Sequence, residues 1–140
     1  MRNNVITICL GTLIVLLVAS ASYAQDIKPT YDLTGIWRSK DPGTQQIFQD
    51  GIDVKHTYIH RDFAHYMTGK YINPTTIKGI MYRTTRSSGC KTQASFTATA
   101  TSANSFVWKW LGKDSNCDLR EGQSGEHIYQ RDGKLEAQTF

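Results

Sequence analysis

The chain has 140 residues, of which 39% are hydrophobic and 20% charged, and its formal net charge is +4. This length suits one domain with a modest core. Charges alternate in sign along the chain, and the one basic cluster, Arg83-Thr-Thr-Arg86 with Lys91 close behind, is weaker than the stripe typical of a nucleic-acid-binding surface. A nucleic-acid partner is therefore not expected.

Residues 1–24 have the pattern of a secretory signal peptide. Arg2 precedes an apolar run over residues 5–18, and small residues then lead to Ser22-Tyr23-Ala24. The apolar run, about fourteen residues, is shorter than the roughly 20 that a membrane-spanning helix needs. We therefore expect cleavage before Gln25. The mature domain, residues 25–140, would be periplasmic or extracellular, with no stable membrane insertion.

Removal of the leader changes the cysteine count. Cys9 lies inside the leader, which leaves Cys90 and Cys117 in the mature chain. Two cysteines in an oxidising compartment indicate one disulfide. It would close a loop of about 27 residues and stabilise the fold by roughly 3–4 kcal/mol. A metal pair would need further ligands nearby, and a redox couple usually has C-x-x-C spacing.

The mature chain alternates apolar and polar residues between turn signals, which is typical of β-strands. Turn signals include the 40–43 segment, Asp50-Gly51, Asn73-Pro74 and the 102–104 segment. The expected strands are 31–37, 44–49, 52–58, 63–72, 75–84, 91–101, 106–111 and 126–131. Eight short strands joined by tight turns predict an all-β, antiparallel, up-and-down barrel, because closure removes the exposed edges. Such a barrel is filled by side chains or holds one small ligand.

The segment Leu33-Thr-Gly35-Ile-Trp37 resembles the Gly-x-Trp opening of the calycin superfamily, which includes lipocalins and avidins. Segments 47–51, 68–71 and 77–79 are similar to bacterial lipocalin-like domains of uncharacterised role. The resemblance covers residues 33–84 well and the remainder weakly. It implies a lipocalin-like barrel in which Trp37 packs across the closed end and Arg131 stacks over it. Gly35 would allow close backbone approach or a bend, so all three residues would be structural.

Neither a metal nor a cofactor is expected. His56 and His60 are four residues apart, which on a strand is about 13 Å and too far for one ion to bridge. Avidins carry an Asn shortly after the Trp, whereas Arg38-Ser39-Lys40 follows here, so biotin is not expected. The chain has no Gly-x-Ser-x-Gly elbow, and we expect it not to be an enzyme.

Two functions remain. In the first, the barrel holds a small apolar or amphipathic ligand. The candidate residues alternate along their strands, so those on one strand share a face. They are His56, Tyr58, His65, Met67, Phe96, Trp108 and Trp110. His56 is either a core group or a polar hook for the ligand. In the second, the protein is a binding module for a protein partner, for example an inhibitor, that uses the polar 112–125 segment around Cys117 and surface tyrosines. The resemblance favours the first.

Overall fold

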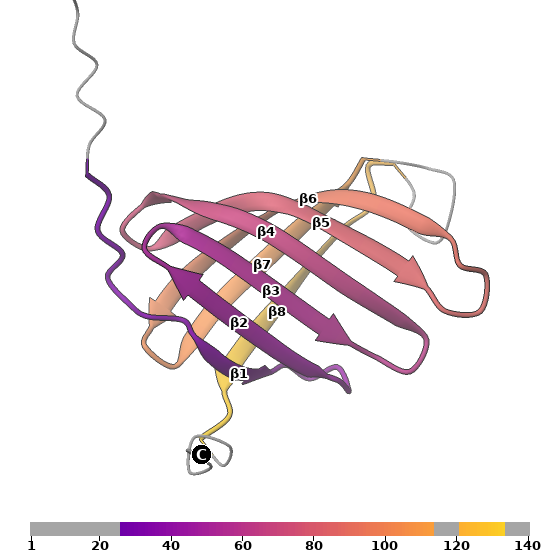
Figure 1. Cartoon of the computed structure of the whole chain (residues 1–140), viewed down its shortest axis with the longest axis horizontal. Helices are drawn as coiled ribbons and strands as arrows, with labels where there is room; N and C mark the ends of the chain where they lie inside the picture. The colour runs from indigo at the N-terminus through magenta and orange to yellow at the C-terminus, as the bar shows by residue number, and fades with distance from the viewer. Residues whose placement is uncertain (1–25, 114–120, 134–140) are drawn as a thin grey trace, which may run out of the picture.

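The computed structural model describes residues 26–113 and 121–133. In these residues eight antiparallel strands follow one another around a closed barrel, and β1 completes it by pairing with β8 (Figure 1). The predicted all-β, eight-stranded, up-and-down fold is confirmed. The strands are β1 (Gly35–Arg38), β2 (Thr44–Asp50), β3 (Asp53–Ile59), β4 (Phe63–Asn73), β5 (Thr76–Thr85), β6 (Lys91–Ser102), β7 (Ser105–Gly112) and β8 (Ser124–Arg131).

The first strand is shorter than the predicted span of residues 31–37, so that prediction was wrong at its start. The backbone N–H groups of Leu33 and Thr34 bond to side chains and not to the backbone of a neighbouring strand: Leu33 donates to Gln49 Oε1 at 3.0 Å and Thr34 to Asp32 Oδ1 at 2.8 Å. Gly35 itself has φ of 142°, a conformation that L side chains rarely adopt. A Cβ at this position would also lie 2.9 Å from Nη1 of Arg131. The other strands match their predicted ends to within two residues.

The tight turn predicted at Asp50-Gly51 lies one residue later. Asp50 and Asp53 are paired across the ladder, so Gly51 and Ile52 form the two-residue connection. The shift places the Ile52 side chain against the core, where it gains contact with buried apolar residues.

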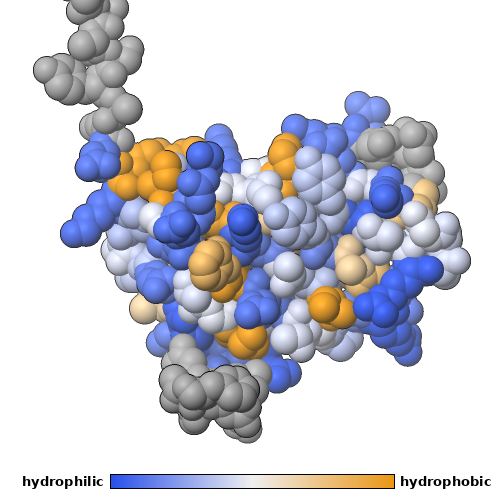
Figure 2. All heavy atoms as spheres, viewed as in Figure 1, coloured by the Kyte–Doolittle hydropathy of each residue, from blue (hydrophilic) through white to orange (hydrophobic). Residues whose placement is uncertain are grey.

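Alternation along each strand separates a buried inner face from a polar outer face. In β3 the even-numbered positions are buried and the odd-numbered positions are exposed, and β6 alternates in the same way. On the face shown in Figure 2, hydrophobic residues appear as separate groups among polar ones. The exposed large hydrophobic residues are Phe48, Ile59, Tyr66, Ile72, Tyr82, Leu111 and Ile128. The buried apolar residues form one cluster in the barrel interior.

One end of the barrel is closed by side chains and by the segment that leads into β1. Trp37 is fully buried there, its Nε1 donates to the carbonyl of Leu33 at 2.8 Å, and its ring meets Phe106 edge-on at 4.9 Å. The guanidinium carbon of Arg131 lies 4.6 Å from the Trp37 ring centroid. Residue Thr30 donates its backbone N–H to Pro74 on the β4–β5 turn, which holds the entering segment across this end (left in Figure 1).

Near the middle of the barrel two glycines make room for a ring. Gly69 and Gly79 face each other on β4 and β5, and Phe96 on β6 packs over them. A Cβ on Gly79 would lie 2.1 Å from the carbonyl oxygen of Thr68 and 2.7 Å from the Phe96 ring. The small pair thus allows close approach of β4, β5 and the Phe96 ring.

We expect Gly79→Ala to lower the free energy of unfolding by about 2–3 kcal/mol, because the backbone of β4 must shift to admit one methyl group. Urea denaturation measures the loss. The matched control is Gly133→Ala, since a Cβ at Gly133 meets no atom within 4 Å. Equal stability of the two variants would contradict the packing account.

Two sequence predictions fall outside the described residues, the first wholly and the second in part. The leader, residues 1–24, is one. The other is the Cys90–Cys117 disulfide, because Cys117 lies in the 114–120 segment. Both stay predictions. No helix in the described part of the chain is long and apolar enough to cross a membrane.

Candidate functional site

The other end of the barrel contains a cavity of about 270 Å³. It lies where the β1–β2 and β3–β4 connections meet the inner face of β7 and β8. Both connections are at the right of the barrel in Figure 1. Its described lining residues are Asp41, Tyr58, Phe63, His65, Met81, Arg83, Trp108, Trp110, His127 and Tyr129. Seven of these ten carry a ring, so the cavity wall is mainly aromatic.

One wall is a column of rings that begins at the rim. His60 stacks on Phe63 with centroids 4.7 Å apart, and Phe63 stacks on His65 at 4.9 Å, with ring planes within 29° and 19° of parallel. Tyr58 packs beside His65 at 5.4 Å. The guanidinium carbon of Arg83 lies 4.1 Å from the Phe63 centroid, a cation–π contact.

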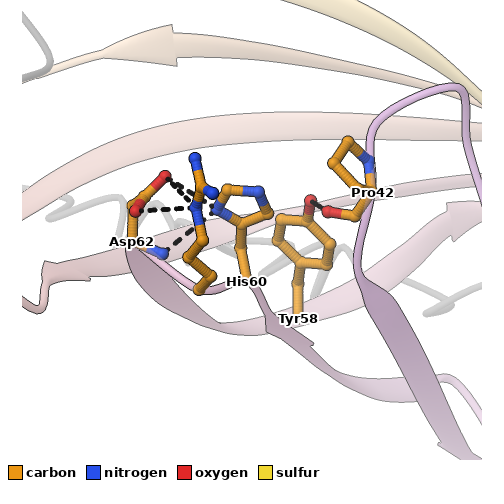
Figure 3. Close-up of polar contacts among 5 residues, drawn as sticks. Pro42, Tyr58, His60 and Asp62 are labelled. Carbon is orange, nitrogen blue, oxygen red and sulfur yellow. Dashed lines mark hydrogen bonds and ion pairs between the residues drawn. The ribbon is translucent and has the colours of Figure 1, made fainter.

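Hydrogen bonds at the rim fix this wall in place. The Tyr58 hydroxyl donates to the carbonyl of Pro42 at 2.7 Å, which ties the β1–β2 connection to β3 (Figure 3). Beside it, Nδ1 of His60 accepts the backbone N–H of Asp62 at 3.2 Å (Figure 3). This bond sets the orientation of the ring at the head of the column.

The facing wall comes from β7 and β8. The Trp108 ring lies 5.6 Å from His127 and 6.2 Å from Tyr129. Trp110 projects beside them and crosses Gly125, where a Cβ would lie 2.5 Å from the indole Nε1. Glycine at this position in β8 therefore allows the Trp110 indole to lie flat against the strand.

Polar groups are few and placed among the rings. Nδ1 of His127 lies 2.7 Å from Oδ2 of Asp41, which joins β8 to the β1–β2 connection at the cavity rim. Nε2 of His65 and Nε1 of Trp108 are buried and have no hydrogen-bond partner among the described residues. A buried polar atom without a partner costs about 1–3 kcal/mol, so these two atoms mark a place where a ligand would restore lost hydrogen bonds.

Burial sets the protonation states of the inner histidines. Burial, reinforced by the charge of Arg83, lowers the pKa of His65 to about 3. Burial alone lowers the pKa of His56 to about 3. Both imidazoles are therefore neutral near pH 7. The pKa of Tyr58 is raised, first by burial and then by the negative charge of Asp41, so its hydroxyl stays protonated as a donor.

All seven predicted ligand-binding candidates lie on the inner face of the barrel, but they divide into two groups. Tyr58, His65, Trp108 and Trp110 line the cavity. His56, Met67 and Phe96 belong to the core instead, because they lie further along β3, β4 and β6 toward the closed end. Nε2 of His56 has no hydrogen-bond partner in the described residues.

Sequence reasoning missed several residues of the cavity. Arg83 and Met81 share the inner face of β5, Phe63 begins β4, and His127 and Tyr129 share the inner face of β8. Their alternation was visible in the sequence, but it did not indicate which face was inner. Asp41 lies in a turn, where no periodic signal exists.

The described residues contain no group of three or more His, Cys, Asp or Glu side chains placed to hold a metal ion. Comparisons of the chain with models of protein families, with curated proteins and with solved structures gave no significant match. The function must therefore be argued from the cavity itself.

Proposed function

We propose that the protein is an exported binding protein that holds a small amphipathic ligand in the cavity at the open end of the barrel. The observation that carries this proposal is the aromatic cavity with two buried, unpartnered polar atoms, Nε2 of His65 and Nε1 of Trp108. Mainly apolar walls with a few placed polar groups are the usual composition of a small-molecule site.

The size of the cavity limits the ligand. Ligand pockets commonly have volumes of roughly 300–1,000 Å³. The cavity, at about 270 Å³, lies just below this range, so its ligand would be smaller than most. The opposite end is filled by Trp37, Phe106 and Leu33, all nearly inaccessible to solvent. A ligand would therefore enter and leave at the end that carries the β1–β2 and β3–β4 connections.

Two parts of the proposal rest on the sequence. Export is proposed from the signal-peptide pattern of residues 1–24, and a relation to the lipocalin-like calycins is proposed from the Leu33-to-Trp37 segment, with which the eight-stranded barrel is compatible. Fold alone does not assign a function, so binding is argued from the cavity and not from the resemblance. We propose a binding role in preference to an enzymatic one, because the sequence contains no recognisable catalytic motif.

Filling the cavity should abolish binding. In His127→Trp a larger ring would occupy the space between the two walls, whereas Ile128→Trp places the same ring on the outer face, where Ile128 is 57% exposed. Native mass spectrometry of protein purified from an oxidising compartment should show an adduct on the wild type and on Ile128→Trp that leaves on denaturation. His127→Trp should carry none.

An apo mass for all three proteins would count against the ligand-binding proposal and move attention to a protein partner. An adduct on all three would place the ligand elsewhere. Circular dichroism and thermal melting would confirm that His127→Trp is folded, because this variant also loses the contact with Asp41.

A further inference from the structure

The cavity favours flat ligands over extended ones. The stacked rings of Phe63 and His65 form one wall, and Trp108 and His127 lie on the other. Aromatic rings attract other rings in offset-stacked or edge-on arrangements, beyond the area that they bury. A planar ligand between these walls would have ring partners on both sides.

The depth of the cavity excludes a long chain. Its deepest described residues are Met81, Trp108 and Tyr129, each nearly inaccessible to solvent. Beyond them the barrel is filled by Phe96, seated on the glycine pair, and by the residues around Trp37. An extended alkyl chain would therefore leave much of its length outside the barrel.

The buried polar atoms of the cavity specify which polar groups the ligand should carry. An indole N–H only donates, so the partner of Trp108 Nε1 must be an acceptor. Trp108 is only 3% exposed, which means that water reaches this donor poorly and a ligand atom is needed to satisfy it. The neutral imidazole of His65 offers a second hydrogen-bonding nitrogen, Nε2, on the opposite wall. The Arg83 guanidinium also lines the cavity, so an oxygen that carries negative charge is compatible with the wall.

We infer that the ligand is a planar aromatic molecule of about two fused rings that bears an oxygen acceptor. The rings lie between the two aromatic walls, and the oxygen accepts a hydrogen bond from the indole N–H of Trp108. This inference rests on the proposed function of the cavity. It adds the class of ligand and the donor that recognises it.

Three probes separate the inference from the proposal on which it rests. Isothermal titration calorimetry compares naphthalene-2-carboxylate, naphthalene-2-carboxamide and decanoate on the full mature protein. Both naphthalene compounds should bind at least about tenfold more tightly than decanoate. Binding of decanoate at equal or higher affinity would overturn the inference and leave the cavity as a ligand site. Failure of all three to bind would overturn the inference, whereas the proposed function is decided separately by the native mass spectra.

A variant of Trp108 tests whether its indole N–H is the donor to the ligand. Trp108→Phe keeps an aromatic ring and removes the N–H, so it should weaken binding of naphthalene-2-carboxylate by about tenfold, the effect of one hydrogen bond. Tyr82→Phe is the control, because Tyr82 lies on the outer face of β5 next to Arg83. The affinity of this variant for naphthalene-2-carboxylate should stay within about twofold of the wild-type value. Unchanged affinity in Trp108→Phe would overturn the assignment of the donor.

The hydrogen bond from Trp108 can also be tested in the wild-type protein, so that the result does not depend on how the variant folds. In proton–nitrogen NMR spectra the indole N–H resonance of Trp108 should move downfield on addition of naphthalene-2-carboxylate. The resonance of Trp37, which already donates to Leu33, should not move. Binding without a shift at Trp108 would contradict the inference.

Discussion

Lowering the pH from 6 to 4 is expected to reduce the free energy of unfolding by about 5 kcal/mol, a loss comparable to the whole stability of many small domains. The cause is the pair of buried histidines, His56 and His65, whose pKa values are both lowered to about 3, chiefly by burial. In the unfolded chain the same groups have a pKa near 6.5. Between these values the unfolded state binds more protons than the folded state.

The direction of the effect follows from this difference. The stabilisation is fully present above the unfolded pKa and is lost as the pH falls toward the folded pKa, so each histidine removes up to about 1.4 kcal/mol per pH unit. Urea denaturation at pH 6, 5 and 4 measures the loss. His56→Phe removes one titrating group and its unpartnered Nε2, and should roughly halve the decrease. An unchanged acid dependence in this variant would contradict the assignment to His56.

Replacing Trp37 with Ala should cost about 4 kcal/mol of unfolding free energy, the largest effect expected for a single side chain here. The ring is fully buried, packs edge-on against Phe106 and lies under the guanidinium of Arg131. Its removal leaves a large void and a cation that has lost its aromatic partner. The indole N–H bond to the carbonyl of Leu33 is lost as well.

Trp110→Ala is the natural comparison, because Trp110 is only partly buried and lines a cavity, so its loss should be clearly smaller. Trp37→Phe keeps much of the packing and gives a measurable value even if Trp37→Ala fails to fold. We expect a decrease of about 1–2 kcal/mol for this change. A Trp110→Ala loss as large as that of Trp37→Ala would contradict the structural role assigned to Trp37.

The fold was predictable from the sequence because strand signals are local. The alternation of Ala94, Phe96, Ala98 and Ala100 with small polar residues defines β6 to within one residue. The start of β1 was not predictable in this way. Its alternation continues back to Tyr31, whereas in the structure the backbone N–H groups of Leu33 and Thr34 bond to the side chains of Gln49 and Asp32 and not to a strand backbone.

The cavity was only partly predictable. Trp108 and His65 were identified because each shares a face with other large side chains on its own strand. The sequence did not indicate that these two faces meet across the barrel, or that Asp41 reaches His127 from a turn. It also did not separate the core residue Phe96 from the cavity, because that division depends on the facing glycines of two other strands.

The guanidinium of Arg131 donates to the carbonyls of Asp32 and Thr34, which are 99 and 97 residues earlier in the chain. These bonds and the β1–β8 pairing join the first part of the barrel to the last. During folding β1 therefore keeps one edge unpaired until β8 reaches it, and closure of so long a loop is entropically costly. Closure of the barrel thus has to wait for β8, the strand farthest from β1 along the chain.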